Sequence, residues 1–151
     1  MKKIFLVILI LLLNNCGYTP IYSNKNSNFK VISLKSNINN NLTNYIENSI
    51  NVFSNEKSNK KLNITFDLKE DISVILKDSK GDPSKNRLTV MVDLSIFDTN
   101  KNLIVSSTFS ESFQYNIDDN KFTLKQYEKN IRQNLVEEIT QQINTFLAQT
   151  I

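Results

Sequence analysis

The sequence contains no histidine and no tryptophan, one cysteine and two glycines among its 151 residues. Histidine is the commonest general base and a frequent zinc ligand, so its absence excludes many acid–base mechanisms and the usual zinc sites. The one cysteine, Cys16, excludes an internal disulfide, and two glycines are too few for a phosphate-cradling loop. Neither a nucleophile with a base nor a suitable pair of carboxylates stands out. We therefore expect a binding protein rather than an enzyme, with no catalytic residue, metal or cofactor.

The charges of the chain are nearly balanced. The formal net charge is +3, from 18 basic and 15 acidic residues. Two of the basic residues, Lys2 and Lys3, lie in a segment that we expect to be removed, which leaves the rest one charge above neutrality. Nucleic-acid binding needs a strongly basic face, so no nucleic acid is expected as a partner. The length and the 40% content of hydrophobic residues predict one globular domain.

The N-terminus has the pattern of a bacterial export signal. Lys2 and Lys3 precede an unbroken run of ten apolar residues, Ile4 to Leu13. As a helix this run would be roughly 15 Å long, about half the thickness of the hydrocarbon core of a bilayer. We therefore expect a cleaved signal peptide rather than a permanent transmembrane helix.

Cys16 lies three residues after Leu13, where a bacterial lipoprotein signal places the cysteine that becomes the acylated N-terminus. Asn14 and Asn15 depart from the small residues that usually precede this cysteine. Each CH₂ group of the acyl chains contributes about 0.8 kcal/mol to membrane binding, so several chains give a permanent anchor. Because Gly17, and not aspartate, follows the cysteine, we expect the outer membrane as the location.

These signals divide the chain into three parts. We predict a cleaved signal peptide at residues 1–15, a lipidated tether at 16–28 and a folded domain at 29–151. The tether is polar and rich in asparagine and serine, and Pro20 opposes a helix in its vicinity.

The predicted domain begins with a strand and a helix. Phe29 to Ser36 is rich in apolar residues and predicts the strand. A spacing of three and four residues then predicts an amphipathic helix from about Asn41 to Ser54, capped by one of the asparagines at 39–41. Its apolar positions are Leu42, Tyr45, Ile46, Ile50 and Phe53.

Apolar residues at every second position predict three long strands that follow, with one dry face. Turns are expected at Gly81 to Pro83 and at Asp98 to Asn102. Glu70 interrupts the apolar face of the first strand and predicts a bulge or a bend there. The alternating residues are Leu62, Ile64, Phe66, Leu68, Ile72, Val74 and Leu76; Leu88, Val90, Val92, Leu94 and Ile96; and Leu103, Val105, Phe109, Phe113, Tyr115 and Ile117.

A second helix is predicted from about Thr123 to the C-terminus, where Thr123 and Gln126 match a capping box. The order strand, helix, three strands, helix predicts an α+β fold: a mixed, mostly antiparallel four-stranded sheet with both helices packed on one face. The apolar stripe of the second helix is Leu124, Tyr127, Ile131, Leu135, Ile139, Ile143 and Phe146 or Leu147.

The opening from Cys16 to Tyr22, Cys-Gly-Tyr-Thr-Pro-Ile-Tyr, followed by this order of elements, resembles the lipopolysaccharide-assembly lipoprotein (LptE) family over nearly the whole chain. The opening is the more specific part, because the remainder matches only by the order of its elements. The resemblance implies a lipoprotein that sits in the lumen of the outer-membrane β-barrel LptD, helps that barrel to fold and binds lipopolysaccharide on its way to the cell surface. It transfers no lipopolysaccharide contact to a residue of this chain.

A cluster of cations provides a candidate contact of its own. The turn between the first two long strands carries Lys77, Lys80, Lys85 and Arg87. Lysine offers phosphate a point charge and arginine a bidentate fork, so we predict that these residues contact lipopolysaccharide phosphates. An ordinary solvated hairpin tip is the competing interpretation.

A different envelope lipoprotein of the binding class is the alternative function. The accessory subunit of an envelope lipid transporter, exposed to the periplasm, could share the anchor, the size and the α+β layers. The partners that co-purify in mild detergent distinguish the two.

Overall fold

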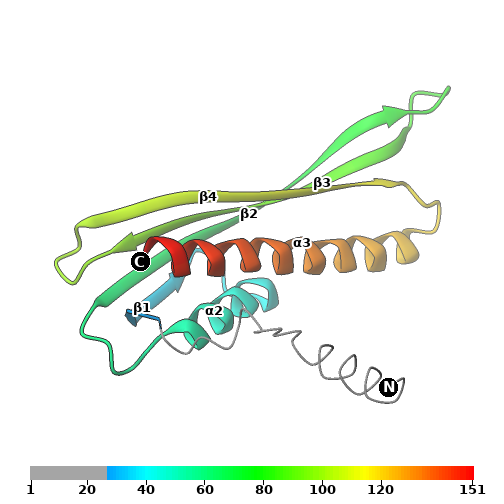
Figure 1. Ribbon diagram of the computed structural model, residues 1–151. Coiled ribbons are helices and arrows are strands. Elements are labelled where there is room, and N and C mark those ends of the chain that lie inside the picture. The colour runs from blue at the N-terminus through cyan, green and yellow to red at the C-terminus, as the bar shows by residue number, and fades with distance from the viewer. Residues whose placement is uncertain (1–26) are drawn as a thin grey trace, which may run out of the picture.

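The computed structural model describes residues 27–151, so the predicted signal peptide, Cys16 and nearly all of the tether lie outside the described residues. The domain is a four-stranded sheet with both helices on one face (Figure 1). The strand order is β1-β2-β3-β4, in which β1 is parallel to β2 and the other pairs are antiparallel. The predicted α+β fold is confirmed. Its elements are β1 (Lys30–Ser36), α2 (Asn41–Phe53), β2 (Lys61–Lys77), β3 (Pro83–Phe97), β4 (Leu103–Asn116) and α3 (Lys121–Thr150).

The start of α2 agrees with the sequence. The side-chain oxygen of Asn40 accepts hydrogen bonds from the backbone N–H groups of Leu42 and Thr43, both at 2.9 Å. The hydroxyl of Thr43 accepts in return from the backbone N–H of Asn40, at 3.0 Å. This reciprocal pair satisfies amides that the first turn of a helix leaves without a partner, and so it fixes where α2 begins.

The predicted capping box of the last helix is wrong. Asn120 caps α3, because its side-chain oxygen accepts from the backbone N–H groups of Phe122 and Thr123, at 3.0 and 3.2 Å. Thr123 therefore lies inside the first turn. The apolar stripe does not reveal this turn, since Phe122 is 73% exposed and the packed part of the helix begins only at Leu124.

The hydrophobic core lies between the helices and the side of the sheet that faces them. On this side, residues opposite one another on β2, β3 and β4 form rows that cross the sheet. Helix α3 covers these rows with Ile131, Leu135, Ile139, Ile143 and Leu147, each no more than 5% exposed. The first three rows are Ile64, Ile96 and Val105; Phe66, Leu94 and Ser107; and Leu68, Val92 and Phe109.

The apolar alternation of β2 continues further than its burial does. Leu68 is 2% exposed, whereas Ile72, Val74 and Leu76 are 43%, 48% and 54% exposed. The β2–β3 hairpin extends beyond the helices as an arm (Figure 1). The prediction of one dry face is therefore correct for the inner half of β2 and wrong for the outer half, because no helix covers that half.

Glu70 stands at the boundary between these two halves, but without the predicted bulge. It pairs with Val90 in an unbroken register, and the register shifts lie further out, between Val74 and Leu76 and between Leu76 and Lys77. The carboxylate of Glu70 instead forms an ion pair with the guanidinium of Arg132 of α3, at 2.6 Å. The interruption of the pattern thus reflects a polar contact between sheet and helix.

We predict that residues with the same place in the alternation differ sharply in their contribution to stability. Leu68→Ala should lower the free energy of unfolding by about 2–5 kcal/mol, because it opens a cavity in the core. Val74→Ala should lower it by less than about 1 kcal/mol, because its side chain already meets solvent. Urea denaturation followed by circular dichroism measures both values, and equal losses would show that the outer half of β2 is packed.

Candidate functional site

The tip of the β2–β3 hairpin is an ordered turn held by Asp78. The side-chain oxygen Oδ1 of Asp78 accepts hydrogen bonds from the backbone N–H groups of Lys80 and Asp82, both at 2.9 Å. The backbone N–H of Asp78 donates to the carbonyl of Asp82, at 2.8 Å. Gly81 has φ +91°, a conformation that other residues rarely adopt. The turn therefore keeps a defined shape at the end of the arm.

The four predicted cations lie along this end of the arm, three of them close to the tip. Lys77 pairs across the hairpin with Pro83, Lys80 lies in the turn, and Lys85 pairs with Leu76. Arg87 lies further back, opposite Ser73. Within residues 27–151, none of the four side chains makes an ion pair or a hydrogen bond. The structure thus leaves their charges available, and a contact with phosphate stays a prediction.

Next to these cations lies an exposed apolar surface, which we call the hairpin strip: Ile72, Val74 and Leu76. Leu76 is the direct cross-strand neighbour of Lys85, so apolar and cationic side chains lie side by side on one arm. Contiguous apolar residues rimmed by polar ones are typical of interaction sites. Sequence alternation alone missed this exposure, and Glu70, where the apolar pattern breaks, is the signal that could have revealed it.

The base of the arm is tied to α3 by a polar network. The hydroxyl of Tyr115 donates to Glu128 at 2.5 Å. Arg132 lies 3.7 Å from Glu128 and 2.6 Å from Glu70, so one guanidinium joins a helix carboxylate to a β2 carboxylate. The side chain of Arg132 is 24% exposed, which screens these contacts less than at an open surface. The network lies where the cover of β2 by α3 ends and the hairpin strip begins.

The environment of Tyr115 changes its acidity. Burial raises the pKa of the Tyr115 phenol, and the hydrogen bond to Glu128 raises it further, while Asn86 and Arg132 act in the opposite direction. Removing the phenolic proton would place a second negative charge beside the carboxylate of Glu128. The network is therefore built around a neutral tyrosine.

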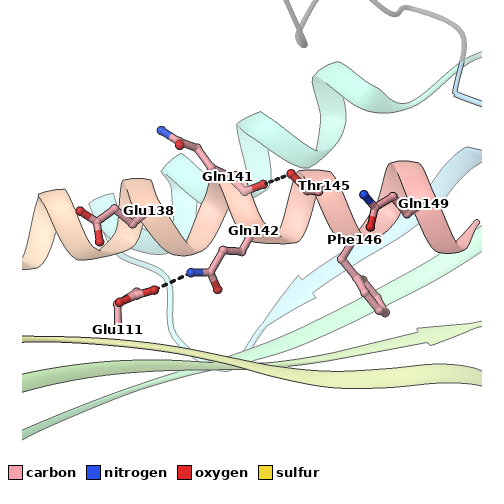
Figure 2. Close-up of a pocket in the computed structure, with 7 residues that line it drawn as sticks. All are labelled: Glu111, Glu138, Gln141, Gln142, Thr145, Phe146 and Gln149. Atoms are coloured by element: carbon pink, nitrogen blue, oxygen red, sulfur yellow. Dashed lines mark hydrogen bonds between the residues drawn. The ribbon is translucent and has the colours of Figure 1, made fainter.

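An open groove of about 550 Å³ lies between β4 and α3, away from the arm (Figure 2). Gln142 of α3 donates to Glu111 of β4 across it, at 2.5 Å. The lining contains two carboxylates and no lysine or arginine, so it does not suit a phosphate. Its residues are Glu111, Glu138, Gln141, Gln142, Thr145, Phe146 and Gln149.

Two further features of the described chain bear on its chemistry. In the range 27–151, no three histidine, cysteine, aspartate or glutamate side chains gather where they could hold a metal ion. None of the helices in that range is both long enough and apolar enough to cross a bilayer.

The fold of this chain is similar to that of solved bacterial lipoproteins. No family model and no curated protein matches the chain. Rare lipoprotein B of Shewanella oneidensis superposes with a TM-score of 0.58 at 13% identity, over 77% of this chain and 94% of that one. A minor lipoprotein of Acinetobacter baumannii superposes with a TM-score of 0.63 at 18% identity, over 79% of this chain and 90% of that one. Lipoprotein B of Nitrosomonas europaea superposes with a TM-score of 0.61 at 13% identity, over 81% of this chain and 86% of that one. This chain is similar to them in fold.

We predict that Tyr115 makes stability depend on pH in the alkaline range. Because its folded-state pKa is raised, its contribution is complete below the ordinary tyrosine pKa of about 10 and is lost as the pH rises through the folded-state value. Tyr115→Phe should therefore flatten the fall in unfolding free energy above pH 10. Urea denaturation at a series of pH values measures the unfolding free energy. An unchanged slope in the variant would show that Tyr115 does not cause the fall.

Proposed function

We propose that the chain is an outer-membrane lipoprotein that binds an LptD-like β-barrel, assists the assembly of that barrel and takes part in lipopolysaccharide transport to the outer membrane and insertion in it. The observation that carries the proposal is the arm, on which unpaired cations lie beside the hairpin strip. The fold shared with rare lipoprotein B and the opening at Cys16 support it. The protein acts by binding rather than by catalysis.

The arm matches the two chemical parts of lipopolysaccharide. Its phosphates suit Lys77, Lys80, Lys85 and Arg87, whose hydrogen bonds to a charged group are worth about 1.5–3 kcal/mol each. Its acyl chains suit the hairpin strip, where full burial of an aliphatic side chain is worth about 1.5–3 kcal/mol. The side chains of the strip are about half exposed, so each would contribute roughly half of that on binding.

The described chain begins at the end of β2 that lies opposite the arm. Lys30, close to the start of the described chain, pairs with Lys61 at the beginning of β2, whereas the cations lie at its far end. The 17 residues of β2 extend roughly 55 Å. A tether from Cys16 to Ser27 spans at most roughly 40 Å. A membrane anchor would thus hold one end of the domain and leave the arm to reach beyond it.

We predict that reversing two charges of the arm weakens lipopolysaccharide binding. Lys85→Glu together with Arg87→Glu should lower the affinity at least about tenfold, since one lost contact of about 1.4 kcal/mol is a factor of ten. Retention of lipopolysaccharide by the immobilised, folded protein, titrated over concentration, measures the change.

The matched control carries the same change in net charge at the other end of the domain. Lys35→Glu together with Lys57→Glu alters two exposed lysines that lie far from the arm and should leave the affinity within about twofold of the parent. Equal retention by the two double variants would remove the arm from the proposal.

We predict that the purified protein carries a large β-barrel with it. Affinity purification in mild detergent, followed by mass spectrometry, should recover the barrel in a constant ratio, and depletion of the protein should reduce the mature barrel. Recovery of an inner-membrane transport complex instead would support the accessory-subunit alternative. Normal barrel levels in depleted cells would count against the proposed role in assembly.

A further inference from the structure

Strand β4 forms an outer edge of the sheet along its whole length. It is the last strand in the order β1-β2-β3-β4, and within residues 27–151 no backbone group pairs with its outer side. Its 14 residues contain one charged residue, Glu111, and no lysine, proline or glycine. Natural proteins usually protect an edge with charges, proline, bulges or shortness, because unpaired backbone groups recruit another strand. β4 has one register shift, at Ile104 close to its start, and from Val105 to Asn116 it lacks these protections.

The other exposed edges of the same sheet carry such protections. β1 has only seven residues, includes Lys30 and Lys35, and has a register shift between Val31 and Ser33. The outer half of β2 carries charged side chains and two register shifts. At the inner end of this free edge, Asn37 caps the ladder, since its side chain accepts from the backbone N–H of Leu68 at 3.0 Å. The contrast within one molecule singles out β4.

From Val105 to Phe113 the sequence of β4 is nearly symmetric in chemical type about Phe109. Antiparallel pairing of β4 with a second β4 around this residue would place hydroxyl side chains opposite hydroxyls on the face away from the helices. On the helix side it would place apolar side chains opposite apolar ones, and Glu111 opposite Ser107, so no like charges meet. The cross-strand pairs would be Thr108 with Ser110, Ser106 with Ser112, and Val105 with Phe113.

One exposed apolar residue of β4, Phe113, gains an apolar partner in this register. Phe113 is 44% exposed in the single chain, although it lies on the side of the sheet that packs against helices elsewhere. In the paired arrangement Phe113 would contact Val105 of the second copy. The contact would remove from water the apolar surface that the single chain leaves open.

The flank of α3 beside this edge is also compatible with its own copy. It is the groove in Figure 2, whose lining includes three glutamines, the carboxylates of Glu111 and Glu138, and no lysine or arginine. A glutamine side chain both donates and accepts, so the same surface from two copies can hydrogen-bond to itself. A basic peptide would need acidic partners along the strand, and β4 offers only Glu111, which Gln142 already engages.

We infer that β4 pairs with β4 of a second copy of this chain, antiparallel around Phe109, to form a two-fold symmetric dimer with one continuous sheet. Two-fold dimers use the same surface from both subunits, and the pattern of β4 meets that requirement. The inference is independent of the proposed function.

The register can be tested with two double variants that differ in one charge sign. Ser106 and Ser112 are exposed and would face each other twice in the dimer. Ser106→Lys with Ser112→Lys would put like charges opposite each other, whereas Ser106→Lys with Ser112→Glu would put opposite charges there. Cross-strand charge pairs differ by up to about 1 kcal/mol each, and two pairs change sign, so the dissociation constants should differ about tenfold or more.

Sedimentation velocity of the purified full-length protein, in detergent excess and over a range of concentrations, gives these constants, and circular dichroism checks that both variants fold. The parent and the lysine–glutamate variant should dimerise, and the dilysine variant should be largely monomeric. A parent that stays monomeric at every soluble concentration would overturn the inference and leave the edge to a strand of another protein. Equal dissociation constants for the two variants would overturn the proposed pairing of β4 with β4 around Phe109.

Discussion

The packing of α3 against the sheet is the contact on which the rest of the domain depends. One face of this helix buries Ile131, Leu135, Ile139, Ile143 and Leu147 over β3 and β4, and α2 packs beside it. The 30 residues of α3 make a rod of roughly 45 Å, while the 17 residues of β2 extend roughly 55 Å along a twisted sheet. The helix therefore cannot cover the whole hairpin. The exposed arm follows from this mismatch in length and direction.

Much of the fold could be predicted from the sequence because it depends on local signals. Alternation determined the three long strands, and Asn40 determined the start of α2. The extent of burial could not be predicted, since Leu68 and Val74 have the same place in the alternation and only the position of α3 separates them. The first turn of α3 was missed because Asn120 caps a stretch without an apolar stripe. Sequence period gives the face of a strand, whereas tertiary packing decides what covers that face.

The candidate site shows the same division. Charge density along the chain predicted the cations of the hairpin, and the structure places Lys77, Lys80 and Lys85 near its tip. The hairpin strip beside them could not be predicted, because exposed and buried strand residues share one pattern. The network that joins Glu70, Arg132 and Glu128 also needed the structure, since its members are far apart in sequence. The arm thus combines a local feature of the chain with one that depends on the assembled fold.

The parallel pairing of β1 with β2 has a mechanical consequence for any load on the N-terminus. β1 enters at the inner end of β2 and runs in the same direction, and its bonds to β2 extend from Lys30 to Ser36. Tension drawn out of that end acts along the strand axis, so it must slide β1 past β2 and break those bonds together rather than one after another. β1 is therefore attached to β2 in shear, so the hydrogen bonds between the two strands share the load.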